Sequence, residues 1–230
     1  MVRSFRKWLK RGVALVAGLT LVGSAVSEVG AAVPRIQAGY DFSVGLRSDG
    51  AVITWGWNRN SQLGIDDSAD YKAVPLIIPD MPGTVEDISA GYYHTLAISD
   101  QNSVISWGYD LQGQLGRSGN HLPAVVSGLS DITAVSAGGY HSLALDSSGS
   151  VWSWGYNFAG QLGAGDTTDR NRPYKIEGLT GVSAIAAGQY HSLALKSNGT
   201  VWAWGYNAQG QVGNGDTSNV LTPVQITGLS

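Results

Sequence analysis

The sequence contains four copies of one unit of about 50 residues, and this repeat constrains the fold more than any other feature. Three glycine motifs recur in the same order, and all three series advance by 52, 47 and 50 residues. They are Ala-Gly at Gly39, Gly91, Gly138 and Gly188, Trp-Gly at Gly56, Gly108, Gly155 and Gly205, and Leu-Gly or Val-Gly at Gly64, Gly116, Gly163 and Gly213. A block of fixed length followed by a variable connection indicates a repeat array, which here fills residues 36 to 230.

Each copy has the pattern of short β-strands. In the fourth copy, apolar residues alternate with small or polar ones over 184–187 and 191–195, which is the period of a strand and not of a helix. Asn198-Gly199 then provides a hairpin turn signal before the next strand. A proline opens a further apolar stretch, expected to be a fourth strand, at Pro75, Pro123, Pro173 and Pro223. We therefore expect an all-β chain of four propeller blades at roughly 36–84, 85–131, 132–181 and 182–230.

Large aromatic residues and histidines recur with the repeat. We expect Trp55, Trp107, Trp154 and Trp204 to be buried between adjacent blades, so that Trp204→Ala costs about 3–5 kcal/mol. His94, His141 and His191 share one repeat position, and we expect each imidazole to bond the backbone at a blade corner. One histidine per blade places them too far apart to share a metal ion, so no metal site is expected. The serines that follow repeat with them, so no catalytic triad is singled out.

The first 32 residues differ from the rest. Five basic residues, Arg3, Arg6, Lys7, Lys10 and Arg11, precede an apolar run over 12–26, and small residues lead to Ala31 and Ala32. This order predicts a secretory signal peptide, because the run is shorter than the ~20 residues that a spanning helix needs. We expect cleavage after Ala31 or Ala32, with an uncleaved signal anchor as the alternative. In either case the propeller at 33–230 is expected to be secreted or extracytoplasmic. If the signal peptide is cleaved, no membrane segment is expected to remain.

Composition excludes several functional classes for the exported part. The chain has no Cys, which removes disulfides, zinc ribbons and thiol nucleophiles. Without the five N-terminal basic residues and Glu28, 9 Lys and Arg face 16 Asp and Glu, a net charge of −7. A body this acidic lacks the basic patch that nucleic acid or an anionic membrane requires. Asp66, Asp166 and Asp216 lie in short loops where aspartate holds turns, and we expect no cofactor.

The repeat resembles a known family. Residues 187–195, 199–207 and 210–213 carry the sequence AGQYHSLAL, GTVWAWGYN and GQVG, which closely resembles the regulator-of-chromosome-condensation repeat. The first copy departs most, because Phe42 replaces the histidine and Asn60-Ser61 replaces Gln-Gly. The resemblance implies a seven-bladed β-propeller. Some eukaryotic members are guanine-nucleotide exchange factors, and exported bacterial members include a propeller-type inhibitor of β-lactamase, although a shared fold does not transfer an activity.

The chain is shorter than the resemblance implies. Seven blades of about 50 residues need roughly 350 residues, and this chain has 230. It ends on Gly228-Leu229-Ser230, which matches the Gly-Leu-Ser and Gly-Leu-Thr that precede the third and fourth copies. We expect a fragment of a seven-bladed propeller. The alternatives are a homodimer that closes an eight-bladed ring and an open row of blades with exposed end faces.

Aromatic residues near strand ends are the candidate binding residues, because an apolar ring with a polar tip anchors partners well. They are Tyr93, Tyr140 and Tyr190 before the histidines, Trp57, Tyr109, Tyr156 and Tyr206 after Trp-Gly, and Asp41 and Phe158 where the copies disagree. These residues predict an exported, non-enzymatic module that binds a protein partner and in one version inhibits a partner enzyme. The alternatives are carbohydrate or cell-wall binding at the same loops and, on family resemblance, exchange-factor activity.

Overall fold

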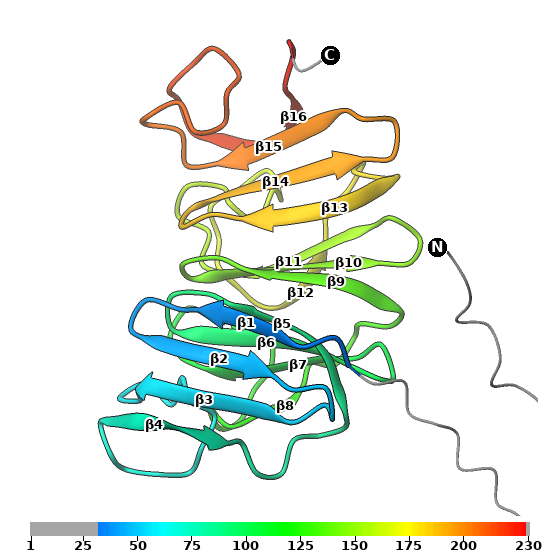
Figure 1. Cartoon of the computed structure of the whole chain (residues 1–230). Helices are drawn as coiled ribbons and strands as arrows, with labels where there is room; N and C mark the ends of the chain where they lie inside the picture. Colours follow the sequence, from blue (N-terminus) through cyan, green and yellow to red (C-terminus); the bar gives the residue numbers. More distant parts are fainter. Residues whose placement is uncertain (1–31, 229–230) are drawn as a thin grey trace, which may run out of the picture. The chain divides into compact units, whose positions relative to one another are not determined.

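The structure, a computed structural model, describes residues 32–228 and is an all-β array (Figure 1). Sixteen strands form four antiparallel sheets of four strands each. The expected fold class, four-stranded propeller blades, is confirmed. The described residues contain no helix with the length and apolar character needed to cross a bilayer. The expected signal peptide lies outside the described residues, apart from Ala32.

Each sheet is one blade, and its strands follow chain order from one edge to the other. The first blade comprises β1 (Arg35–Ala38), β2 (Phe42–Leu46), β3 (Val52–Trp57) and β4 (Tyr71–Ile77). The second comprises β5 (Val85–Ala90), β6 (His94–Ser99), β7 (Val104–Gly108) and β8 (Ala124–Val125). The third comprises β9 (Ile132–Ala137), β10 (His141–Asp146), β11 (Val151–Gly155) and β12 (Arg170–Lys175). The fourth comprises β13 (Val182–Ala187), β14 (His191–Lys196), β15 (Val201–Gly205) and β16 (Val220–Gln225).

The register of the two middle strands is the same in every blade and defines equivalent positions. The recurring tryptophan always lies opposite a small hydroxyl residue, in the pairs Ser43 with Trp55, Thr95 with Trp107, Ser142 with Trp154 and Ser192 with Trp204. The histidine position lies opposite the glycine of Trp-Gly, as in His141 with Gly155. Because a slip of one residue would turn every side chain to the other face, this shared register presents the same surface to each neighbour.

The fourth strand differs from its expected extent in three blades. Pro75, Pro173 and Pro223 lie inside β4, β12 and β16, so the expectation that proline opens this strand was wrong there. Proline is tolerated because the strand is at the sheet edge, where a missing N–H breaks no ladder. The register between the third and fourth strands of these blades also shifts, as between Ser153 and Gly155 of β11.

Three apolar layers, one between each pair of successive sheets, form the core. Trp107, Trp154 and Trp204 are completely buried in these layers. Trp55 is only half-buried, so the expectation of burial between two blades was wrong for it. Its side of the first sheet faces away from the second blade, and no further sheet among residues 32–228 covers it.

Glycines allow the first strands of successive blades to approach closely. A Cβ atom on Gly91 would lie 2.3 Å from the Gly138 carbonyl oxygen, and one on Gly138 would lie 2.6 Å from the Gly188 carbonyl oxygen. Main-chain hydrogen bonds join the same loops, with Tyr92 N–H donating to Gly138 O at 3.3 Å. The ends of all four first strands line a hollow of about 390 Å³.

Candidate functional site

A hydrogen-bonded set of three side chains and one main-chain carbonyl group joins the second blade to the third, and we call such a set a clasp. It consists of His94 and Gln114 from one blade and Ser142 and Trp154 from the next. His94 Nε2 lies 2.9 Å from Ser142 Oγ, and Ser142 Oγ donates to the Gln114 carbonyl oxygen at 2.8 Å. Trp154 Nε1 donates to the same oxygen at 2.8 Å. The third and fourth blades repeat the set with His141, Gln161, Ser192 and Trp204, at 2.8–2.9 Å.

The donor pattern fixes the state of the histidines. Because the Ser142 proton goes to Gln114, His94 Nε2 must carry a proton and donate to Ser142 Oγ. Burial lowers the pKa of His94 to about 3. The pKa of His141 is also lowered to about 3, by burial and by the neighbouring histidines. Both rings are therefore neutral at physiological pH.

His94 and His141 therefore each bond a serine of the next blade, and the expectation of a backbone partner was wrong for them. Each ring instead lies over the glycine three residues before it, where a Cβ would come within 2.7 Å of its atoms. His94, His141, Ser142 and Ser192 are buried or tied into the core, and the serine protons are committed to carbonyl groups. A nucleophile must reach its substrate, so these His-Ser pairs are structural and not catalytic.

The first seam, between the first and second blades, has no clasp. Phe42 replaces the histidine and packs with Leu63 and Ile65. Thr95 and Trp107 occupy the serine and tryptophan positions, and both Thr95 Oγ1 and Trp107 Nε1 are buried without a hydrogen-bond partner in the described part of the chain. The four described blades therefore meet at one seam without a clasp, which we call the plain seam, and at two clasped seams.

The candidate aromatic residues gather in one continuous row on the face formed by the β1–β2, β5–β6, β9–β10 and β13–β14 loops and the ends of the third strands. Neighbouring ring centroids lie 5.0–6.4 Å apart. Tyr92, Tyr140 and Tyr190 link the last three blades, with Tyr140 and Tyr190 stacked at 6.0 Å. The aromatic row comprises Tyr40, Tyr92, Tyr93, Tyr109, Tyr140, Tyr156, Phe158, Tyr190 and Tyr206.

Main-chain hydrogen bonds bring two aromatic residues of the row together in each of the last three blades. Tyr109 N–H donates to Tyr93 O at 2.9 Å, and Tyr156 N–H donates to Tyr140 O at 3.0 Å. Burial and nearby tyrosines raise the pKa of Tyr140 to about 12. Its hydroxyl is therefore uncharged at neutral pH and able both to donate and to accept hydrogen bonds.

Two predicted binding residues lie outside the row, because the first blade has different side chains at these positions. Asp41 is exposed, and its carbonyl accepts Trp57 N–H at 2.8 Å. Trp57 packs against Arg59, whose guanidinium carbon lies 5.0 Å from the ring centroid. Two members of the row were missed from the sequence, Tyr40 and Tyr92. The signal for them was present, since the copies disagree there, with Gly139 and Gln189 at the corresponding positions.

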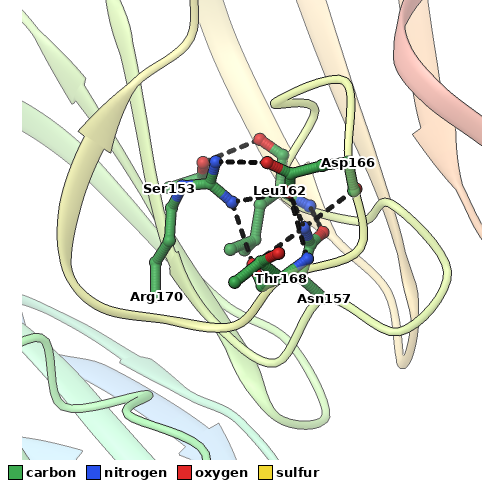
Figure 2. Close-up of polar contacts among 6 residues, drawn as sticks. All are labelled: Ser153, Asn157, Leu162, Asp166, Thr168 and Arg170. Atoms are coloured by element: carbon green, nitrogen blue, oxygen red, sulfur yellow. Dashed lines mark hydrogen bonds and ion pairs between the residues drawn. The ribbon is translucent and has the colours of Figure 1, made fainter.

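Buried asparagines fix the long loops beside the row. Figure 2 shows the third blade, where Asn157 Nδ2 donates to the carbonyl oxygens of Asp166 at 3.0 Å and Thr168 at 3.1 Å. Asn157 Oδ1 accepts Leu162 N–H, and Arg170 closes the loop with two bonds to the Asp166 carboxylate. The aspartate thus holds a turn. Within residues 32–228 no three His, Asp or Glu side chains gather as metal ligands would.

The second blade builds the same loop in another way. Asp110 replaces the asparagine and cannot donate, so Arg117 donates to the Asn120 and Ser106 carbonyl oxygens at 2.9 Å each. Burial raises the pKa of Asp110. A hollow of about 340 Å³ beside Asp110 is lined by Arg59, Leu111 and His121. This blade therefore presents a surface that the other three do not have.

Comparison with known proteins identifies the family. Residues 20–230 match the model of the RCC1-like domain. The chain belongs to the RCC1-like domain family. Solved structures of the family share the fold. The structure of Kap60 bound to yeast RCC1 (Prp20) matches with a TM-score of 0.77 and 25% identity over 84% of this chain and 48% of that chain. Human WBSCR16 matches with a TM-score of 0.75 and 25% identity, over 84% and 52%.

Sequence relatives are longer than this chain. The ultraviolet-B receptor UVR8 of Arabidopsis thaliana is 33% identical over 102 residues, which is 43% of this chain and 23% of UVR8. The human E3 ubiquitin-protein ligase HERC2 is 34% identical over 114 residues, 47% of this chain and 2% of HERC2. This RCC1-like chain thus matches about a quarter or less of these relatives and about half of the solved structures.

Proposed function

We propose that this RCC1-like chain is an exported, non-enzymatic module that binds a protein partner through the aromatic row. The observation that carries the proposal is the continuity of the row across all four blades on one face. Its two most exposed members, Tyr40 and Phe158, have 62% and 41% of their surface accessible. Large rings with few rotatable bonds anchor partners at a low entropic cost, and the tyrosine hydroxyls add hydrogen bonds.

Solved relatives support a protein as the partner. Yeast RCC1 (Prp20) is bound to Kap60 in one structure, and another study of Prp20p concerns its binding to Gsp1p and histones. Kap60, Gsp1p and histones are named for Prp20 and are not assigned to this chain. Its acidic body, with a net charge of −7 outside the N-terminal segment and Glu28, favours a partner with a neutral or basic contact surface. Inhibition of a partner enzyme is one outcome of such binding.

The row is tested by truncating its two exposed rings together, Tyr40→Ala with Phe158→Ala. Wild type, this variant and a control with Val125→Ala, an exposed side chain on the outer strand β8, are each used to capture proteins from the source organism's extracytoplasmic fraction. We expect one protein that the wild type and the control retain and the double variant loses, with binding of the purified pair at least tenfold weaker for the double variant.

Equal retention by all three proteins would show that another surface binds. Release of the captured material by soluble cell-wall glycans, with no protein retained, would replace the proposal with carbohydrate binding. Circular dichroism checks that the variants fold. We expect unchanged folding because both truncated rings are exposed.

Export is tested by N-terminal sequencing of the protein recovered outside the cytoplasm. The Ala32 methyl group is buried in the first apolar layer, and its N–H donates to Ser48 O at 3.1 Å. Retaining Ala32 keeps this packing, so we expect cleavage after Ala31 in preference to Ala32. A protein that is found only in the cytoplasm with an intact N-terminus would overturn the export proposal.

A further inference from the structure

We propose that the hollow beside Asp110 binds a basic side chain of the protein partner, the ammonium group of a lysine or the guanidinium group of an arginine. The inference rests on the proposed function, because it assigns the chemistry of one contact next to the aromatic row. The hollow of about 340 Å³ lies at the seam between the first and second blades, and all of its lining residues fall within 59–121. It is therefore bounded inside the array and not by either end of the sequence.

A shortened loop opens this hollow in the second blade. The connection from the Leu-Gly motif to the proline has six residues here, 117–122, whereas it has ten in the first blade, 65–74, and nine in the third and fourth, 164–172 and 214–222. In the longer loops, the asparagine at the position of Asp110 donates to loop carbonyl oxygens and is at most 5% exposed. Asp110 is only half-buried, so the shorter loop leaves this position open to a ligand.

The open position offers hydrogen-bond acceptors. Asp110 Oδ1 accepts Leu115 N–H at 2.8 Å, and no group among residues 32–228 donates to Oδ2, which is open to solvent. His121 Nδ1 donates to Gly108 O at 2.9 Å, so Nε2 of the neutral ring is an acceptor. Asp110 and His121 both line the hollow. The ligand should therefore bring hydrogen-bond donors.

The carboxylate also lacks a positive charge of its own. Burial raises the pKa of Asp110, and the Leu115 hydrogen bond and the neighbouring His121, Arg117 and Arg172 offset only part of this effect. A partly buried carboxylate is stabilised most by a cation that contacts it directly. A donor that carries a positive charge therefore fits the site better than a neutral hydroxyl or amide.

The arginines around the hollow have their hydrogen bonds elsewhere. Arg117 donates to main-chain carbonyl oxygens and a serine hydroxyl, and Arg172 donates to a serine hydroxyl at 2.9 Å. Arg59, on the wall of the hollow, is paired with the Asp70 carboxylate at 2.8 Å. None of the three forms an ion pair with Asp110 in the described part of the chain. Because they oppose a further cation from a distance, we expect an isolated basic side chain to bind weakly, with a Kd of about 1–10 mM.

A basic side chain on a protein fits the hollow better than other cations do. Leu111 is 78% exposed, and together with Tyr109 it provides apolar surface for the methylene stem of a lysine or arginine. Tyr109 belongs to the aromatic row, so a partner that lies along the row reaches the hollow with one side chain. The acidic body, with a net charge of −7 outside the N-terminal segment and Glu28, also attracts a basic segment.

The test measures peptide binding to the full chain by NMR, with the resonances of Tyr109, Leu111 and His121 as the readout. The probes are acetylated and amidated pentapeptides, Gly-Ser-Lys-Ser-Gly and its versions with arginine or norleucine at the centre. We expect the lysine and arginine peptides to shift these resonances saturably at millimolar concentration. The norleucine peptide has the same stem without a charge and should bind at least tenfold more weakly.

Asp110→Asn is the matched variant, because the other three blades carry asparagine at this position and Oδ1 can still accept Leu115 N–H. It should abolish the preference for lysine over norleucine and leave the resonances of the other blades unchanged. Asp131→Asn removes the same charge from an exposed residue just before β9 and should keep the preference. Equal binding of the lysine and norleucine peptides to the wild type, or an Asp110→Asn variant that keeps the preference, would overturn the inference.

A second comparison separates this inference from the proposed function. The double variant Tyr40→Ala with Phe158→Ala leaves the hollow intact, so it should bind the lysine peptide like the wild type even though it loses the partner. For the partner that the wild type captures, Asp110→Asn should weaken binding at least fivefold, and unchanged affinity would overturn the inference. Failure to capture any protein refutes the proposed function, whereas loss of the lysine preference refutes the assignment of the hollow.

Discussion

The first seam and the two clasped seams join blades of the same repeat with the same apolar layer, yet they differ in their polar contacts. At the second and third seams, Ser89 Oγ and Ser136 Oγ also accept main-chain N–H groups of Ala137 and Ala187, whereas Gln37 occupies this position at the first seam. The first seam has instead an ion pair between Arg35 and Asp87 at 3.1 Å, half-exposed to solvent. An exposed pair contributes little, so the comparison indicates that apolar packing alone can align two blades and that the clasp adds strength.

The largest expected effect separates a completely buried tryptophan from its half-buried equivalent. Trp154→Ala empties a completely buried site and removes a hydrogen bond, so the free energy of unfolding should fall by about 3–5 kcal/mol. Trp55→Ala removes a half-buried ring on an end face and should cost about 1 kcal/mol. Chemical denaturation of both variants measures the difference. Equal losses would show that Trp55 is covered as fully as Trp154.

The pH dependence of stability tests the clasp histidines. The folded-state pKa of His94 and His141 is about 3, below the ordinary value of 6.5, so the unfolded chain binds more protons between these values. Their contribution is complete above about pH 6.5 and is lost as pH falls toward 3. Each histidine should remove about 1.4 kcal/mol per pH unit within this window.

The matched variant for this experiment is His141→Phe, which places at a clasped seam the residue that the first seam already has. This variant should reduce the slope of the free energy of unfolding against pH by the contribution of one histidine, about 1.4 kcal/mol per pH unit between pH 3 and 6.5. A slope identical to that of the wild type would show that His141 is not buried in its neutral form.

The smallest of the expected effects differs in sign between seams. Ser142→Ala leaves His94 Nε2 and the Gln114 carbonyl with fewer partners and should destabilise the protein by about 1–2 kcal/mol. Thr95→Val removes a buried hydroxyl that has no partner in the described structure and should be neutral or stabilising by up to about 1 kcal/mol. Thermal unfolding of the pair checks the prediction, and a loss of stability in both variants would show that Thr95 is also hydrogen-bonded.

Much of the fold could be predicted from the sequence, because the repeat states each strand four times. The equal spacing of the Trp-Gly and Ala-Gly series placed the strands, and the aromatic positions predicted most of the row. The clasp could not be predicted, because His94 and Ser142 are 48 residues apart and come together only when two blades pack. The half-burial of Trp55 was missed for the same reason, since periodicity treats every copy alike and cannot tell an end blade from a middle one.

The most direct test of the seam comparison is native-state amide hydrogen exchange in β2 and β14. These strands are equivalent and lie in the first and fourth described blades, each of which has one seam within residues 32–228, plain for the first and clasped for the fourth. Four hydrogen bonds of the third seam have no counterpart at the plain seam, and at about 1 kcal/mol each they should make amides of β2 exchange about a hundredfold to a thousandfold faster than those of β14. Equal or slower exchange in β2 would contradict the conclusion that the clasp strengthens the contact between blades.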